Sequence, residues 1–155
     1  LENCRIPADH LLGAEGEGYK IALSNLESGR IGIAAQSVGM ARAALDAAVE
    51  YANERTAFGE PISHRQSVAF MIADMAIEID AMRMLILNAA SLAESGQTFH
   101  REAYLARLLC AEKAMKIGTD GVQILGGHGF TKEHPVERWY RDLRATAIVH
   151  SGLHA

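Results

Sequence analysis

The sequence predicts an all-α protein, an antiparallel four-helix bundle preceded by a short extended segment at the N-terminus. Two observations support this fold class. Apolar residues recur with the spacing of a helix over four stretches, and short connections containing Gly and Pro separate the stretches. The chain has 155 residues, of which 49% are hydrophobic and 22% charged. This length and composition suit one globular domain with a real core.

Residues 1–18 are expected to differ from the rest of the chain. The segment Cys4–Ala8 resembles the end of an extended strand, and a loop with three glycines follows it. A strand edge without a partner leaves backbone groups unpaired, and the chain begins with Leu1 instead of Met. We therefore expect residues 1–18 to be the end of a preceding β-domain and a linker, and residues 19–155 to form the helical domain.

The first two helices are expected over residues 19–53 and from Ser63 to about Glu94. In the first helix, the apolar face is predicted to include the early residues Tyr19, Leu23 and Leu26. In the second, Ser63 and Gln66 match a capping box. Four methionines of this helix are predicted to fill the core: Met71, Met75, Met82 and Met84.

The third helix is expected to begin after Thr98 and to end at a glycine-rich turn. Its apolar face is predicted to carry six residues: Leu105, Leu108, Leu109, Met115, Val122 and Leu125. Pro135 suits the first position of a fourth helix. Five apolar residues of that helix are predicted to face inward: Val136, Trp139, Tyr140, Leu143 and Ile148.

Charge and cysteine content limit the possible classes of function. The net charge is −4, and the fifteen Lys and Arg residues are scattered, so nucleic acid is not an expected partner. Charges interrupt every apolar run before membrane-spanning length, so membrane insertion is not expected either. Cys4 and Cys110 lack metal-ligand spacing and are interpreted as small buried hydrophobes in a reducing compartment, with a disulfide between them left open.

The segment Gln123–Phe130, Q-I-L-G-G-H-G-F, places three glycines within four positions after the third helix. One glycine is enough to end a helix. The others suggest a backbone that approaches another group closely, such as a pyrophosphate or a neighbouring chain. A generous helix C-cap is the alternative.

Four motifs occur in a fixed order along the chain. They are N-L-E-S-G-R-I at 25–31, E-R-T-A-F-G at 54–59, the glycine segment at 123–129 and R-W-Y-R-D at 138–142. Together they resemble the C-terminal helical domain of the acyl-CoA dehydrogenase family, and the resemblance covers nearly the whole chain. It implies FAD-dependent α,β-dehydrogenation of an acyl-CoA thioester.

The resemblance also implies roles for individual residues. Arg55 would bind the FAD pyrophosphate across a subunit interface with Phe58 beside it, since a guanidinium fork suits phosphate oxygens. Gln66 would contact the flavin. The adenosine and pyrophosphate part of FAD would be contacted by Gln123, Gly126 and Gly127. An obligate homodimer or homotetramer follows. From the residues alone, a solvated cation near a helix C-terminus is the preferred interpretation of Arg55.

Glu27 and Arg30 match the family positions that contact acyl-CoA. A cation within a Gly- and Ala-rich helical stretch needs a compensating group, because burying it unpaired is costly. An ion pair between Glu27 and Arg30 is the alternative explanation. The implied partners are therefore an acyl-CoA substrate, further copies of the chain and an electron-transfer flavoprotein, in the bacterial cytoplasm or the mitochondrial matrix.

The sequence departs from the family at the catalytic base. The usual glutamate position is occupied by His150, and the alternative base position, directly before Arg30, is Gly29. Three explanations stay open: His150 acts as the base, the scaffold serves other chemistry or none, or the segment after Ile148 is not native family sequence. The catalytic residue is therefore unassigned. A related flavin oxidase or monooxygenase and a non-catalytic oligomerisation module are the alternative functions.

Overall fold

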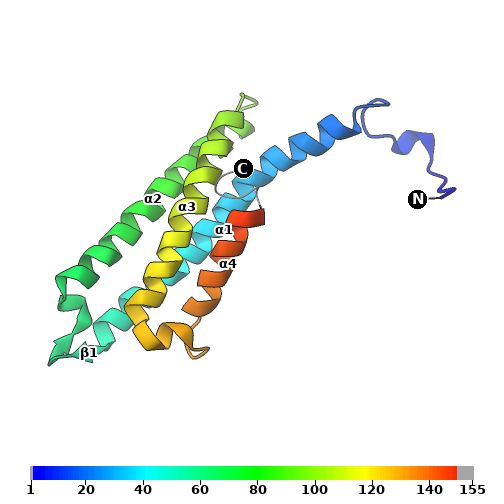
Figure 1. The fold of residues 1–155 in the computed structure, drawn as a ribbon. Coiled ribbons are helices and arrows are strands. Elements are labelled where there is room, and N and C mark those ends of the chain that lie inside the picture. The colour runs from blue at the N-terminus through cyan, green and yellow to red at the C-terminus, as the bar shows by residue number, and fades with distance from the viewer. Residues whose placement is uncertain (1, 150–155) are drawn as a thin grey trace.

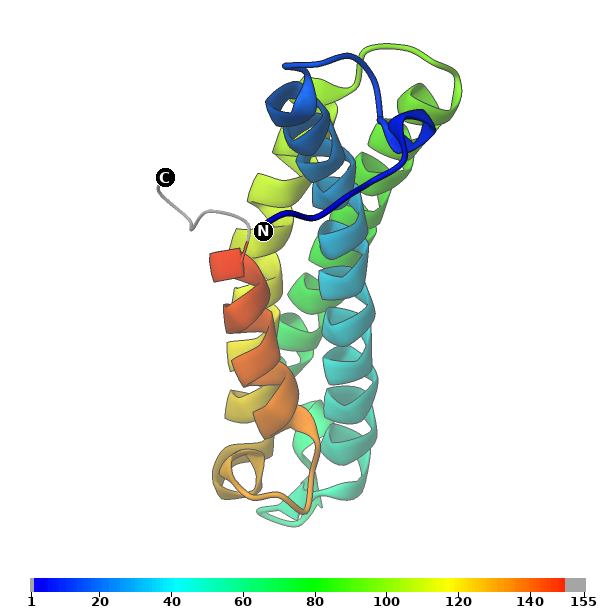
Figure 2. The ribbon, with the colours of Figure 1, turned by 90° about the vertical axis from the view of Figure 1, so that its right-hand side faces the viewer.

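The computed structural model describes residues 2–149 and confirms the four-helix bundle (Figure 1). The four helices are α1 (Gly18–Glu54), α2 (Gln66–Glu94), α3 (His100–Leu125) and α4 (Val136–Val149). Successive helices run in opposite directions. Helices α1 and α3 form the central pair, and α2 and α4 pack on opposite sides of that pair (Figures 1 and 2).

The central pair packs through small residues. Ala41 and Ala48 of α1 are completely buried, as is Ala106 of α3. A Cβ added to Gly121 of α3 would lie 3.7 Å from the Cβ of Ala44. Alanine and glycine let the two helix backbones approach closely, which explains why these residues, and not the leucines of α3, form the innermost layer. Of the predicted apolar face of α3, Val122 and Leu125 are buried, whereas Met115 and the three leucines at 105, 108 and 109 are only half-buried.

A short hairpin connects α1 to α2. Strands β1 (Thr56–Ala57) and β2 (Glu60–Pro61) pair antiparallel, and the 3-10 helix η2 (Ile62–His64) follows. Helix α2 therefore begins at Gln66, three residues later than predicted, with Arg65 at its N-cap and no side-chain cap. The capping box was wrong because Ser63 lies inside η2.

The first turns of α1 extend beyond the other helices (Figure 1). Tyr19 is 78% exposed and Leu26 61% exposed, and Leu23 is exposed as well. Within the described residues, Ala34 is the first buried residue of α1. The prediction that this early apolar stripe is buried within the chain was wrong. Periodicity identified the helix correctly, but no other helix of the described chain reaches this stripe.

In the outer helices α2 and α4, periodicity again identified the helix but not which of its apolar residues are buried. On α2, Met75 and Met82 are buried as predicted, whereas Met84 is 67% exposed. On α4, Leu143 is buried, but Tyr140 and Ile148 are exposed and Trp139 is half-buried. Helices α2 and α4 each pack against the central pair on one side only. Apolar residues at the edges of a wide apolar stripe therefore remain exposed. Helix α3 begins at His100, with Phe99 in place of Thr98 at the N-cap.

The described N-terminal residues form the 3-10 helix η1 (Ala8–His10) and no strand. Both thiols are free, with Cys4 exposed and Cys110 buried. Burial raises the pKa of the Cys110 thiol to about 12, because a buried thiolate would lose its hydration. Within residues 2–149, no helix combines the length and apolar character needed to cross a membrane.

Candidate functional site

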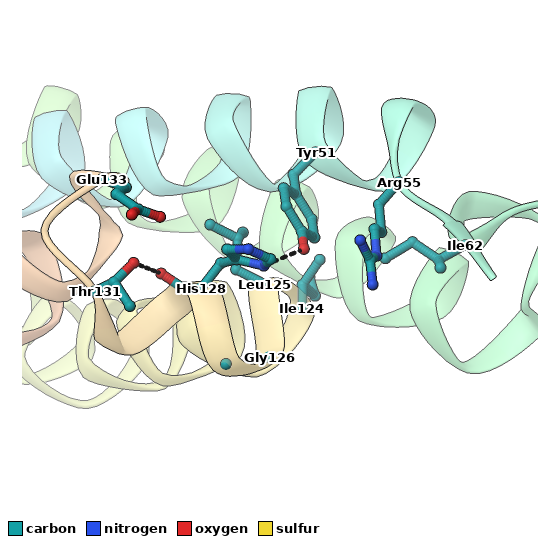
Figure 3. A pocket seen from close by; sticks show the side chains of 10 residues that line it. Tyr51, Arg55, Ile62, Ile124, Leu125, Gly126, His128, Thr131 and Glu133 are labelled. Carbon is teal, nitrogen blue, oxygen red and sulfur yellow. Dashed lines mark hydrogen bonds between the residues drawn. The ribbon is translucent and has the colours of Figure 1, made fainter.

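A pocket of about 620 Å³ lies between the C-terminal end of α1 and the glycine-rich turn (Figure 3). The turn itself is the 3-10 helix η3 (Gly126–Phe130). Ten residues line the pocket: Tyr51, Arg55, Ile62, Ile124, Leu125, Gly126, Gly127, His128, Thr131 and Glu133. Three of the predicted cofactor residues, Arg55, Gly126 and Gly127, therefore meet in one cavity although they come from opposite halves of the sequence.

The three glycines of η3 serve different purposes. Gly126 adopts a φ of 59°, a left-handed conformation that favours glycine. A Cβ on Gly129 would lie 2.4 Å from the carbonyl oxygen of Val122, so close packing against α3 requires glycine there. Gly127 has neither a positive φ nor any atom within 4 Å of an added Cβ. The fold accounts for two of the glycines, and the third faces the pocket without a structural requirement.

The backbone of Arg55 is held by two hydrogen bonds, whereas its side chain has no partner within the described residues. Its N–H donates to the Tyr51 carbonyl at 2.8 Å, and its carbonyl accepts from the N–H of Ile62 at 2.9 Å. The exposed guanidinium makes no ion pair or hydrogen bond within residues 2–149. Its place at the C-terminus of α1 favours a positive charge. A rigid backbone therefore presents a guanidinium that retains all its donors.

Tyr51 and His128, two of the residues that line the pocket, belong to a cluster of aromatic and imidazole rings. The Tyr51 hydroxyl lies 2.9 Å from Nδ1 of His128, and His134 stands edge-on to both rings at 5.6 and 5.8 Å between centroids. Tyr51 and Glu133 were missed in the sequence. A signal for Tyr51 did exist, because it precedes Arg55 by four residues and so shares its face of α1.

The other predicted cofactor residues lie outside this pocket. Phe58 is 96% exposed at the hairpin tip with a φ of 56°, an unusual conformation for an aromatic residue. The Arg65 guanidinium lies 5.5 Å from the centre of its ring. Gln66 is exposed at the start of α2, and Gln123 is exposed on the last turn of α3. None of these three residues is among the ten that line the pocket.

The two predicted acyl-CoA residues lie far from the pocket. Arg30 precedes Arg55 by 25 residues on α1, or about 37 Å at 1.5 Å per residue. Glu27 does not pair with Arg30, and its carboxylate instead lies 2.5 Å from Nδ1 of His100 at the start of α3. Arg30 makes no ion pair or hydrogen bond within the described chain. Gly29 is half-buried on the same turns, and His150 lies outside the described residues.

Comparison with known proteins identifies the class to which this fold and site belong. The sequence model that describes the family "Acyl-CoA dehydrogenase, C-terminal domain" matches residues 16–152 of this chain. The chain therefore belongs to the acyl-CoA dehydrogenase family and corresponds to its C-terminal helical domain, as the four sequence motifs predicted.

Individual relatives agree with this assignment. The mitochondrial short-chain specific acyl-CoA dehydrogenase of Mus musculus is 47% identical over 148 residues, which are 96% of this chain and 36% of that protein. The solved butyryl-CoA dehydrogenase of Megasphaera elsdenii has a TM-score of 0.92 and 43% identity, over 96% of this chain and 39% of that one.

A second solved structure is similar as well. A chain in the structure described as the electron transferring flavoprotein of Acidaminococcus fermentans has a TM-score of 0.93 and 45% identity, over 98% of this chain and 40% of that one. The present chain thus spans less than half the length of each of these relatives.

Proposed function

We propose that this chain is the C-terminal part of an enzyme that dehydrogenates an acyl-CoA thioester between its α and β carbons, using FAD. In this proposal residues 1–18 end a middle β-domain and a linker, and residues 19–155 form the helical domain. The observation that carries the proposal is the pocket in which the free guanidinium of Arg55 meets the unshielded backbone of Gly126 and Gly127.

The pocket residues fit a dinucleotide. Pyrophosphate oxygens need donors, which the Arg55 guanidinium supplies in a planar fork, and they need close access to backbone, which Gly127 provides because no Cβ intervenes. The apolar side chains of Ile62, Ile124 and Leu125 give the same cavity an uncharged wall. Bound FAD would supply the acceptor for the β-hydrogen.

Exposed residues around the pocket support an oligomer. Phe58, Gln66 and Gln123 lie outside the cavity and are exposed, so we assign them to FAD held mainly by a neighbouring subunit. This arrangement requires a homodimer or a homotetramer. An electron-transfer flavoprotein is the proposed electron acceptor, in the bacterial cytoplasm or in the mitochondrial matrix, as the mitochondrial relative from Mus musculus supports.

Glu27 and Arg30 are the proposed acyl-CoA contacts at the opposite end of α1. The free guanidinium of Arg30 supports a role in binding an anionic or carbonyl group of the substrate. The short-chain and butyryl-CoA relatives favour a short acyl group. The α-proton needs a base, and neither family position holds a carboxylate, since they carry Gly29 and His150.

The missing carboxylate favours a second candidate function, a helical module that binds flavin or its own copies without catalysing dehydrogenation. An oxidase or monooxygenase on the same scaffold is distinguished by transfer of electrons to oxygen instead of to a flavoprotein.

A fluorescence titration with FAD tests the proposal, with the oligomeric state recorded in the same sample. Saturable binding by an oligomer, followed by reduction of the bound flavin when butyryl-CoA is added to the intact protein, is the expected result. Flavin binding without reduction would support the non-catalytic module. An intact, folded protein that binds no FAD would contradict the dehydrogenase and a flavin-binding module, and would leave only a module that binds its own copies.

A further inference from the structure

His128 lies in the middle of the pocket that the proposed function assigns to FAD. Figure 3 shows its ring between Glu133 on one side and the α1 residues Tyr51 and Arg55 on the other. Nδ1 is held by the Tyr51 hydroxyl at 2.9 Å. Nε2 has no hydrogen-bond partner within residues 2–149. One ring nitrogen is thus committed to the protein, and the other is free to bind a ligand.

The bond to Tyr51 decides which nitrogen of the neutral ring carries the proton. A phenol O–H is a far stronger acid than the N–H of a neutral imidazole, so Tyr51 donates and Nδ1 accepts. The ring proton then resides on Nε2. If the ring becomes charged, Nδ1 donates to the phenol oxygen and Nε2 still carries a proton. Nε2 is therefore a donor in both charge states of the ring.

The charged groups around the pocket indicate what this donor would meet. Arg55 supplies a cation on one side, and Glu133 supplies an anion on the other. His134 contacts the His128 ring edge-on. An anionic oxygen is attracted to the Arg55 guanidinium and can accept from Nε2–H, whereas a hydroxyl or amino group can donate to Glu133. Adenosine diphosphate carries phosphates, ribose hydroxyls and an amino group, and it matches this polarity.

We propose that His128 is a further cofactor-binding residue: its Nε2–H donates to a phosphate oxygen of the adenosine diphosphate half of FAD, in the pocket that Arg55 also lines. Tyr51 is the positioning residue that orients the ring and sets its tautomer. This inference rests on the proposed function, because it takes FAD as the ligand of the pocket. It adds a binding group within the glycine segment at 123–129, where the resemblance assigns roles only to Gln123, Gly126 and Gly127.

Two conservative substitutions of His128 distinguish a residue that contacts the ligand from one that only supports the pocket through its bond to Tyr51. The amide nitrogen of Gln can reach the position of Nε2, and the amide oxygen of Asn can reach the position of Nδ1, where it accepts from Tyr51. His128→Gln therefore keeps the ligand-facing donor and loses the Tyr51 bond, whereas His128→Asn does the reverse. FAD affinity of the intact protein is measured by fluorescence for both variants and for Tyr51→Phe.

We expect His128→Asn to weaken FAD binding roughly tenfold, the loss typical of a hydrogen bond to a charged group. His128→Gln should stay within about threefold of the parent, and Tyr51→Phe should show a small loss because the tautomer is no longer fixed. The opposite order, with Asn retaining affinity and Gln losing it, would overturn the inference and make His128 only a brace for Tyr51.

The probe ADP separates failure of this inference from failure of the proposed function. ADP should compete with FAD, and His128→Asn should weaken ADP by the same factor as FAD. If Arg55→Ala weakens FAD while His128→Asn does not, the inference fails and the proposed function stands. If the parent protein binds neither FAD nor ADP, both fail. The thermal unfolding midpoint of each variant confirms folding, and the exposed position of His128 predicts little change.

Discussion

The two ends of α1 differ in how completely the chain surrounds them. At the C-terminal end, α1 and η3 enclose a pocket and are joined by the bond between Tyr51 and His128. At the N-terminal end, α1 extends beyond the other helices, and the ion pair between Glu27 and His100 links it to α3. The first end is a preorganised site within one chain. The second presents Glu27 and Arg30, the proposed acyl-CoA contacts, on turns of α1 that hold no fully buried residue within the described chain.

Hydrogen exchange should show the largest contrast between the two ends. In the 155-residue chain, amides of α1 between Lys20 and Leu26 should exchange on the order of a thousandfold faster than those between Ala41 and Ala52. The first segment opens without losing buried contacts, whereas the second opens only with the core. Mass spectrometry of exchanged peptides measures this ratio. Equal protection of both segments would mean that another surface covers the projecting turns, for example in an oligomer.

Gly129→Ala should disrupt the pocket end by destabilising the fold. The new Cβ would lie 2.4 Å from the Val122 carbonyl oxygen, so backbone must move, at a cost of about 3 kcal/mol in the free energy of unfolding. Gly127→Ala is the matched control, because its Cβ meets no atom. It should change stability by less than about 0.5 kcal/mol. Chemical denaturation measures both, and equal losses would contradict the separation of structural and ligand-facing glycines.

Arg55→Ala should affect the pocket end without affecting the bundle. Loss of a charged donor to pyrophosphate should weaken FAD binding by about 2 kcal/mol, or about thirtyfold. The unfolding midpoint should stay unchanged, because the guanidinium makes no ion pair or hydrogen bond in the described chain. Arg42→Ala removes another exposed cation, from the middle of α1, and should leave FAD affinity intact. Equal flavin content in both variants would remove Arg55 from the site.

His100→Ala should have the smallest effect and should act only at the projecting end. The pair with Glu27 is partly exposed, and such pairs contribute on the order of 0.5 kcal/mol. FAD affinity should not change, whereas exchange in the first turns of α1 should accelerate slightly. A loss of several kcal/mol in unfolding would show that this pair anchors the whole helix.

The sequence predicted helices better than it predicted which helix faces were buried. The predicted limits of α1, residues 19–53, differ from Gly18–Glu54 by one residue at each end. A local period of 3.6 residues identifies a helix, but it carries no information on where the neighbouring helix lies. Tyr19, Met84 and Ile148 continue an apolar period and are nevertheless exposed, since no part of the described chain covers them.

In the candidate site as well, local sequence patterns predicted some features, whereas contacts between residues distant in the sequence could not be predicted. The glycine surplus at 126–129 was visible in the sequence, and the family motifs indicated Arg55. The bond between Tyr51 and His128 joins residues 77 positions apart, and no local pattern predicts such a contact. The capping box at Ser63 failed for a related reason, because the chain after Pro61 first forms a 3-10 turn.

The two thiols differ in accessibility, so their alkylation can report on unfolding of the chain. Alkylating reagents attack the thiolate, and Cys110 is both buried and held protonated by a pKa of about 12, whereas Cys4 is exposed. At mildly alkaline pH the folded chain should therefore take up one label, near its N-terminus, and a second label only when the core opens. Counting labels over time then gives the opening rate of the core without any engineered probe.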